Sequence, residues 1–241
     1  MTPSAVRVPS AVRSLFAAWG LAFEPATTRA FARYVAELQA WNRRVNLTAW
    51  RTAEEIWLHL VADALALLAV YPWPPGSRWA DVGSGAGIPG VPLHLARPTS
   101  PFTLIEATAK KARFLDHVRR ALALPRLTVL PQRAEVVGQD PAHREAYDGV
   151  VARAVAPLPT LLEYMLPLLR VGGVAVAYKG QRAAEEVDAA ARALEVLGGR
   201  VQDLVPVPEL PYPRVLVFIE KTRPTPAAYP RRPGRALKRP L

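Results

Sequence analysis

From Arg78 onward, short apolar segments alternate with segments of helical pattern, and this alternation restricts the fold more than any other feature of the chain. The apolar segments predict strands over 78–83, 102–107, 127–132, 147–155 and 172–180, and helices are predicted over 90–96, 108–123, 158–170 and 183–197. Apolar strands separated by helices are typical of a doubly wound α/β fold with a mostly parallel sheet. Two last strands, over 200–207 and 214–221, are too close in sequence for a helical crossover, so we expect an antiparallel hairpin.

The residues before the sheet predict a small helical cap. One helix is expected over 27–44, where Thr27 or Thr28 can cap the first turn and apolar residues recur at helical spacing (Phe31, Tyr34, Val35, Leu38 and Trp41). A second helix is expected from Thr52, which forms a capping-box pattern with Glu55, to about Val70. The segment "YPWPPGS" at 71–77 fits neither a helix nor a central strand, and it ends the cap.

Charge is concentrated at the two ends of the chain. The net charge is +11, of which residues 1–51 carry +5, residues 52–220 carry −1 and residues 221–241 carry +7. Two basic ends beside a nearly neutral body suit a nucleic acid lying across one face, although a solubilising tail has the same composition. We expect a helical cap over 1–75, an α/β domain over 76–221 and an extended, proline-rich basic tail over 222–241.

Composition excludes several kinds of chemistry. Cysteine is absent, so disulfides, thiolate metal sites and cysteine nucleophiles are excluded. The four histidines are scattered along the chain, and we expect no metal site. No apolar run approaches the ~20 residues that span a bilayer, and the N-terminus lacks a signal-peptide pattern. We therefore expect a cytoplasmic protein that makes no contact with membranes.

The stretch "WADVGSGAGIPG" at 79–90 predicts a ligand site after the first strand of the sheet. Gly83, Gly85 and Gly87 form G-x-G-x-G, but Ile88 stands where the dinucleotide fingerprint needs glycine, and no P-loop is present. Asp81 precedes the first glycine, and Glu106 ends the second strand, placed to bind the hydroxyls of a ribose. This combination favours S-adenosylmethionine as cofactor, with structural glycines or a nicotinamide cofactor as the alternatives.

Several segments between 46 and 241 resemble the glucose-inhibited division protein B (RsmG) family, whose members methylate N7 of a guanosine in small-subunit (16S) ribosomal RNA. The resemblance is carried by His59 with Asp63 and by "NLTA" (46–49), "DVGSGAGIPG" (81–90), "IEATAKKARFL" (105–115), "RAE" (133–135), "DGVVARAVAPL" (148–158), "PLLRVGGVAVAYKG" (167–180) and "TPAAYPRRPG" (225–234). The G-x-P-G end of the turn and the YPRR-x-G tail are its most specific parts. One departure is Ala64, where the family commonly has serine, which puts any role for that serine in doubt here.

The resemblance implies a Rossmann-like, class I S-adenosylmethionine-dependent methyltransferase fold, with cofactor contacts at Gly83, Ile88, Ala134, Glu135 and Arg153. Glu135 would accept a hydrogen bond from the exocyclic amine of adenine, and its alternative role is to cap the following helix. Arg153, near the end of the fourth predicted strand, would lie where substrate meets cofactor. Its alternative role is a salt bridge to Asp148 or Asp81.

The resemblance and the charge pattern together predict contacts to substrate RNA at Asn46, His59, Lys110, Lys179, Tyr229, Arg231 and Arg232. Each has a structural alternative. His59 and Asp63 could form a helix-stabilising pair, the lysines (Lys111 included) could be solvated, and the tail could pack on its own domain.

Two features that other methyltransferases use are missing here, and their absence restricts which atom the protein can methylate. Methylation of a pyrimidine C5 normally needs a cysteine, and amine methylation usually uses an Asp/Asn-Pro-Pro-aromatic motif where this chain has "ARAVAP". Guanine N7 carries a free lone pair and no proton, so the reaction needs no general base and we name none. Arg153 is expected to position the substrate in a monomeric enzyme. The alternatives are a methyltransferase for a small molecule or protein, a non-catalytic RNA-binding assembly factor and a nicotinamide oxidoreductase.

Overall fold

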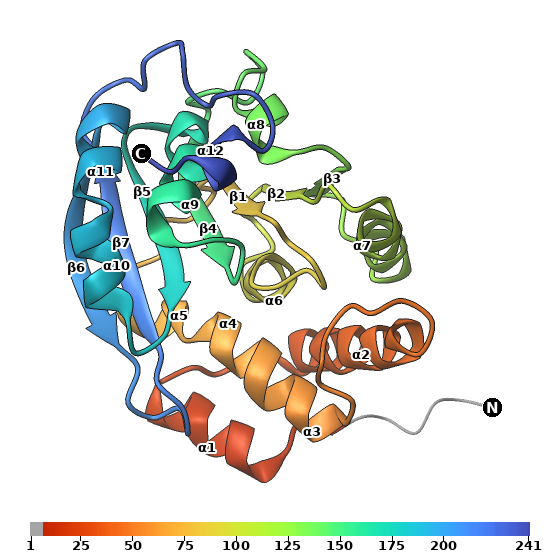
Figure 1. Ribbon diagram of the computed structural model, residues 1–241. Helices are drawn as coiled ribbons and strands as arrows, with labels where there is room; N and C mark the ends of the chain where they lie inside the picture. The colour runs from red at the N-terminus through yellow and green to blue at the C-terminus, as the bar shows by residue number, and fades with distance from the viewer. Residues whose placement is uncertain (1–6) are drawn as a thin grey trace.

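The computed structural model describes residues 7–241, so residues 1–6 of the expected cap lie outside the described part, and its central element is a seven-stranded sheet (Figure 1). The strands are β1 (Trp79–Val82), β2 (Phe102–Ile105), β3 (Leu127–Leu130), β4 (Tyr147–Arg153), β5 (Leu169–Lys179), β6 (Gly199–Pro206) and β7 (Val215–Lys221). They lie in the order β3-β2-β1-β4-β5-β7-β6. The first five are parallel, and β7 runs antiparallel to both of its neighbours. The predicted doubly wound sheet and its terminal hairpin are therefore confirmed.

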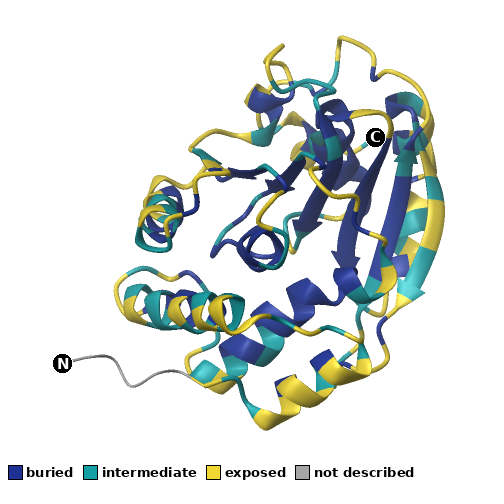
Figure 2. Ribbon diagram, turned by 180° about the vertical axis from the view of Figure 1, so that it is seen from behind, coloured by how far each residue is buried: buried dark blue, intermediate teal, exposed yellow. Residues whose placement is uncertain are grey.

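Helices cover both faces of the sheet. One face packs on the cap and on α6 (Gly90–Ala96) and α7 (Ala109–Ala121), and the other packs on α8 (Ala134–Val137), α9 (Leu158–Met165), α10 (Ala183–Ala189) and α11 (Ala191–Leu197). Because side chains alternate along a strand, Val151 belongs to the first core and its neighbours Val150 and Ala152 belong to the second. Figure 2 shows the central strands buried between these layers.

Some predicted boundaries were wrong. The helix expected over 158–170 ends at Met165, a 3₁₀ turn follows over Leu166–Leu168, and β5 already begins at Leu169. Pro167 explains the early end, because a proline lacks the N–H that a continuing helix needs. The helix expected over 183–197 is interrupted at Ala190, and no sequence signal marks that break.

The cap consists of α1 (Ser10–Ala18), α2 (Pro25–Asn42) and a longer helical segment made of α3 (Ala53–Ile56), a π-helical turn (Trp57–Ala62), α4 (Asp63–Leu65) and α5 (Leu67–Val70). Helix α2 starts before the expected Thr27 or Thr28, because Pro25 suits a first helical turn. The predicted capping box is confirmed: Oγ1 of Thr52 accepts from N of Glu55 (3.2 Å), and Oε2 of Glu55 accepts from N of Thr52 (2.9 Å).

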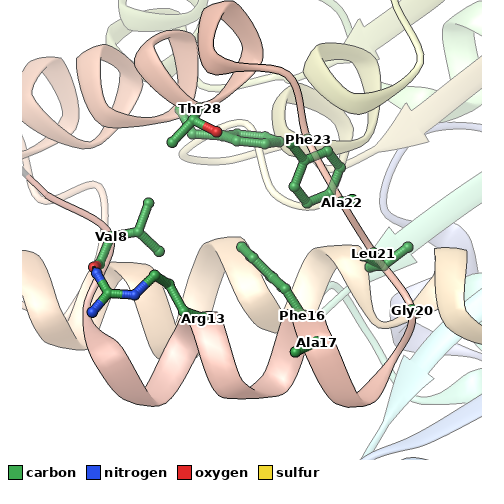
Figure 3. Close-up of a pocket in the computed structure, with 10 residues that line it drawn as sticks. Val8, Arg13, Phe16, Ala17, Gly20, Leu21, Ala22, Phe23 and Thr28 are labelled. Carbon is green, nitrogen blue, oxygen red and sulfur yellow. The ribbon is translucent and has the colours of Figure 1, made fainter.

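Aromatic rings join the helices of the cap. Phe23 packs edge to face against both Phe16 and Phe31, with ring centroids 5.4 and 5.3 Å apart, and Phe31 packs in the same way on Trp57. Figure 3 shows the cavity of about 460 Å³ beside these rings. Its lining is mostly apolar, and none of the residues expected to bind cofactor or RNA lies in it.

The cap is continuous with the sheet. Trp73, in the proline-rich segment, stacks on Trp79 of β1 with ring centroids 3.9 Å apart. Buried residues of the cap and of one sheet face form a single hydrophobic cluster. The boundary expected near residue 75 therefore stays a prediction, because no break in packing marks it.

The tail is not extended throughout, so that expectation was wrong. It contains α12 (Arg235–Lys238), which buries Ala236, and in Figure 1 it lies beside α8 and α9. Side chains of the domain bind its backbone: Arg144 donates to the carbonyls of Thr225 and Tyr229, both at 2.7 Å. These bonds satisfy carbonyl groups that would otherwise face water, and they fix the tail to its own domain. In the described part of the chain, no helix has the length and apolar character needed to cross a membrane.

We expect Thr52→Ala to lower the free energy of unfolding by about 1 kcal/mol, because the substitution removes one acceptor of the capping box. For a chain of this size, the melting temperature should fall by roughly 2–4 °C. Thr27→Ala is the matched control. It lies inside α2 with no side-chain hydrogen bond among the described residues, so its stability should not decrease. Equal losses in both variants would contradict the role of the cap.

Candidate functional site

A glycine-rich turn over residues 83–90 joins β1 to α6 at the carboxyl edge of the sheet. Gly83, Gly85 and Gly87 have φ values of +71°, +56° and +89°, which L side chains rarely adopt. A Cβ atom at Gly83 would lie 2.6 Å from Cγ2 of Val155. The turn therefore needs glycine at position 83 both for its backbone conformation and for its contact with the loop after β4.

Glu106 follows β2 and holds the turn. Its Oε2 accepts from N of Gly85 at 2.8 Å, and its Oε1 accepts from N of Thr108 at 2.7 Å. The side chain is buried, yet each carboxylate oxygen can accept a further hydrogen bond. The position and chemistry of this carboxylate suit the predicted binding of ribose hydroxyls.

Asp81 lies fully buried below the same turn. Its Oδ2 accepts from N of Gly90 at 3.0 Å, and its Oδ1 has no hydrogen-bond partner among the described residues. Burial raises the pKa of Asp81 to about 7, and nearby Glu106 adds to this rise. A buried acid with an unpaired oxygen fits a ligand that brings its own hydrogen-bond donor.

The cap reaches the turn directly through Tyr34. This side chain of α2 is fully buried, and its hydroxyl donates to the carbonyl of Ala86 at 2.7 Å. Burial raises the pKa of Tyr34 far above its ordinary value, so the hydroxyl remains a donor. The conformation of the turn is thus supported from the cap as well as from the sheet.

Arg153, at the end of β4, pairs with an acid of the cap. Its Nη1 lies 2.7 Å from Oδ2 of Asp63 and donates to the carbonyl of His59 at 2.7 Å. The fully buried Asp63 also accepts from Nε of Arg214 at 2.6 Å. The alternative of a salt bridge from Arg153 to Asp148 or Asp81 was therefore wrong, and Asp63 pairs with these two arginines rather than with His59 in a helix-stabilising pair.

Three aromatic rings stack beside this ion pair, two of which the sequence analysis missed. The ring of His59 lies between those of Trp50 and Tyr212, with centroid distances of 3.8 and 4.9 Å. Burial, helped by Arg153, lowers the pKa of His59, so the ring is neutral at pH 7. All three side chains are half-buried. The rings come from three separate segments. The resemblance pointed to this place through His59 and through "NLTA" next to Trp50, but not to Tyr212.

Two cavities meet at Arg153. One, of about 210 Å³, lies against the glycine turn and is lined by Leu47, Thr48, Leu60, Gly83, Ser84, Gly85, Ala86, Ile88, Lys111, Arg153 and Ala154. The other, of about 490 Å³, is lined by Arg153, Ala154, Val155, Ala156, Pro157, Tyr178, Lys179, Gly180, Glu186 and Arg214. Arg153 and Ala154 belong to both walls. The two cavities are therefore neighbours, and Arg153, which Asp63 and the carbonyl of His59 hold in place, lies in the wall that they share.

Of the predicted RNA contacts, the structure brings only Lys179 to the walls of these two cavities. Lys179 lines the larger one, but its Nζ donates to Oε2 of Glu186 (2.6 Å) and to the carbonyl of Ala156 (2.9 Å). Lys110 and Asn46 are exposed and line neither cavity.

The predicted residues after β3 and in the tail contact one another and line neither cavity. Ala134 and Glu135 form the first turn of α8, whose N-cap is Arg133, so the capping role considered for Glu135 was wrong. Oε1 of Glu135 accepts from N of Gly234 at 2.9 Å. In the tail, Arg231 lies over the ring of Tyr229 and pairs with Glu163, whereas Arg232 is exposed.

Comparisons with known proteins identify similar sequences and a matching family model. Residues 27–209 match the family model described as GidB: rRNA small subunit methyltransferase G. The chain is 50% identical over 226 residues to the ribosomal RNA small subunit methyltransferase G of Roseiflexus sp. (strain RS-1), covering 93% of this chain and 96% of the relative. The protein of the same name from Deinococcus radiodurans is 45% identical, covering 88% of this chain and 84% of the relative.

Solved structures show the same fold at low identity. A mutant of the 16S rRNA (adenine(1408)-N(1))-methyltransferase from Catenulisporales acidiphilia, with cosubstrate SAM, is 17% identical with a TM-score of 0.53, covering 61% of this chain and 86% of that chain. A geranyl diphosphate methyltransferase in complex with GPP and sinefungin is 13% identical with a TM-score of 0.54, covering 79% and 100%. The sheet is thus that of class I S-adenosylmethionine-dependent methyltransferases.

We expect Gly83→Ala to destabilise the protein more than Gly85→Ala. Both residues have positive φ, which costs about 1 kcal/mol for alanine, but only the first new Cβ would meet Val155. Overpacking there should add roughly 1–3 kcal/mol in urea unfolding. Val155→Ala should recover part of this extra loss in the Gly83→Ala background, and strictly additive losses would contradict the contact.

We expect the free energy of unfolding of Asp81→Asn to increase relative to that of the parent protein as pH rises. Between about pH 4 and pH 7, the native state holds a proton on Asp81 that the unfolded chain releases, so the free energy of unfolding of the parent falls. Asparagine has no such proton. The difference between variant and parent should therefore grow by up to about 4 kcal/mol across this range and stay constant above pH 7. Urea unfolding of the ligand-free proteins at pH 5 and pH 8 tests this, and an unchanged difference would refute it.

Proposed function

Because this chain belongs to the rRNA small subunit methyltransferase G family, we propose that it transfers a methyl group from S-adenosylmethionine to N7 of a guanosine in small-subunit ribosomal RNA. The chain is an enzyme, a methyltransferase. The observation that carries the proposal is the meeting of two cavities at Arg153, one against the glycine turn and one against the end of β5. A cofactor and an acceptor base need such neighbouring spaces.

The residues around the turn fit S-adenosylmethionine. The backbone of Gly83, Gly85 and Gly87 can approach the ligand closely because these residues have no side chain. Glu106 would accept from the ribose hydroxyls, and the unpaired oxygen of Asp81 suits the amino group of the methionine part. Ile88, which lines the smaller cavity, offers an apolar face, and Ala134 with Glu135 would receive adenine. A nicotinamide cofactor is not favoured, because the dinucleotide fingerprint is broken at Ile88.

The proposed chemistry needs positioning more than proton transfer. S-adenosylmethionine supplies a methyl group on a positively charged sulfur, and the N7 lone pair of guanine forms the new bond as the carbon–sulfur bond breaks onto sulfur. No proton leaves N7, so the protein needs no general base. Its task is to hold the acceptor in line and within ~3–3.5 Å of the methyl group. Asp63 and the carbonyl of His59 fix Arg153 at the wall shared by both cavities, where it would orient the base.

The RNA would approach along exposed cations. Lys110 and Arg232 are exposed, and Lys111 lines the smaller cavity, so these three can meet phosphates. Lys179 is neutralised by Glu186, and we propose that it shapes the base cavity rather than binding phosphate. Asn46 and the ring of His59 would contact RNA at the rim. The target guanosine must be unpaired or flipped out of its stack to enter the cavity.

We further propose that the enzyme acts as a monomer without a metal ion, because the sulfonium already activates the methyl group. In residues 7–241, no three histidine, aspartate or glutamate side chains gather as a metal-binding group. Ribosomal small subunits are found in the cytoplasm, where the enzyme would act. The three parts of the chain would then be a helical cap (1–75), a methyltransferase domain (76–221) and a basic tail (222–241).

A methyl-transfer assay tests the reaction. Purified protein is incubated with methyl-labelled S-adenosylmethionine and with small subunits from cells that lack this gene, and in parallel with their deproteinised RNA. After digestion to nucleosides, we expect the label in 7-methylguanosine with at least one substrate. Label in a different nucleoside would overturn the N7 assignment. Absence of label from both substrates, in protein that binds the cofactor, would favour a small molecule or a protein as the acceptor.

A further inference from the structure

The C-terminal tail is anchored where it leaves the sheet. Lys221, the last residue of β7, is fully buried, and its Nζ donates to the carbonyl of Leu166 and to Oγ1 of Thr225, both at 2.6 Å. It also donates to Oε1 of Glu145 at 3.1 Å. A buried ammonium needs such partners, so the start of the tail has one fixed course.

A second anchor lies in the middle of the tail. Glu163 of α9 is fully buried and receives Arg231 on both carboxylate oxygens. N and Nε of Arg231 donate to Oε1 at 2.8 and 2.9 Å, and Nη2 donates to Oε2 at 2.6 Å. Nη2 also donates to the carbonyl of Arg239. The guanidinium is thus occupied by its own protein and is not available to an RNA phosphate, unlike that of the neighbouring Arg232.

The third contact of the tail reaches the proposed adenine site. N of Gly234 donates to Oε1 of Glu135, which is buried, while Oε2 accepts no hydrogen bond from the described residues. Gly234 has a φ of +77° and is the N-cap of α12, so its N–H points to Glu135 only while this local turn is intact. Nearby, Oγ1 of Thr160 donates to the carbonyl of Ala236 and ties α12 to α9.

We infer that residues 229–236 form a strap that orients the carboxylate of Glu135 toward the amino group of adenine. One oxygen is held by the tail and the other is left for the ligand. Arg231 and Gly234 are then positioning residues of the cofactor site: Arg231 acts through Glu163, and Gly234 acts on Glu135 itself. The inference rests on the proposed binding of S-adenosylmethionine, and it assigns Arg231 and Gly234 to the cofactor site, whereas the exposed Arg232 stays available to RNA.

Two ligands isolate the contact between Glu135 and the amino group. S-adenosylhomocysteine carries that amino group, whereas S-inosylhomocysteine has a carbonyl oxygen in its place. A carbonyl oxygen has no proton to donate, so it cannot form a hydrogen bond with the carboxylate of Glu135. Calorimetric titration of the full-length protein should show a preference for the adenosyl ligand of roughly tenfold or more, because the inosyl ligand leaves Glu135 unpaired. The ratio of the two affinities therefore reports the orientation of Glu135.

Arg231→Ala should reduce affinity for S-adenosylhomocysteine about tenfold while affinity for S-inosylhomocysteine changes little, so the ratio falls toward one. Arg232→Ala is the matched control, since it removes the neighbouring exposed arginine, and it should keep the ratio of the parent protein. Because Arg231→Ala leaves Glu163 buried without its partner, folding is checked by thermal melting.

Glu163→Gln gives a second route that leaves no buried carboxylate unpaired, and the guanidinium of Arg231, which loses its counter-ion, is only half-buried. The amide nitrogen of the new glutamine would face a donor nitrogen of Arg231 and could not accept a hydrogen bond from it. The tail would then be held less firmly, and the ratio of the two ligand affinities should fall as well. The inference is overturned if the folded variants keep the parent ratio, or if both ligands weaken equally, as a merely structural role predicts. A parent protein that binds neither ligand would overturn the proposed function itself, and a parent that binds both equally would remove the role of Glu135.

Discussion

One buried carboxylate of the cap, that of Asp63, holds two arginines of the sheet, and the site depends on this interaction. Arg153 ends β4 and Arg214 precedes β7, so the carboxylate joins the cap to two strands. Removing one member of a buried ion pair typically costs about 3–5 kcal/mol, because the remaining charge lies unpaired in a medium of low dielectric constant. The cap is therefore part of the wall of the site and not an appended module.

Backbone carbonyls of the cap complete this junction. Hydroxyls of Tyr178 and Tyr212 donate to the carbonyls of Ala64 and Leu58, at 2.7 and 3.3 Å. At position 64 the contact is thus made by the main chain, which alanine supplies as well as serine does. The departure from the family pattern at Ala64 leaves this hydrogen bond unchanged.

Local signals allowed much of the fold to be predicted from the sequence. The alternation of apolar and helical segments located all seven strands, and the short connection before 214–221 indicated a hairpin. By contrast, helix α8 was not predicted, because its four residues are too few to show a helical periodicity. The capping box at Thr52 and Glu55 was equally readable, because its two residues are three positions apart.

Interactions between distant residues could not be predicted in the same way. A buried arginine at 153 indicated an acidic partner, but the residue types do not say which acid lies beside it in space. The stack of Trp50, His59 and Tyr212 and the docking of the tail depend equally on pairs far apart in the chain. The glycine turn was the exception among site features, since Gly83 and Glu106 are linked by one strand–helix–strand unit whose geometry is fixed.

The bonds that join cap and sheet also set an order of events during synthesis. Asp63 and Arg214 are separated by 151 positions, and Leu58 and Tyr212 by 154. A ribosome that adds about 5–20 residues each second makes the cap helices roughly 8–30 seconds before it makes these last partners. Until Arg214 has left the ribosome, the carboxylate of Asp63 lacks one of its two arginine partners. The cap therefore cannot reach its final packing against the sheet before then. Closure of the cap on the sheet is thereby coupled to synthesis of the segment that precedes β7.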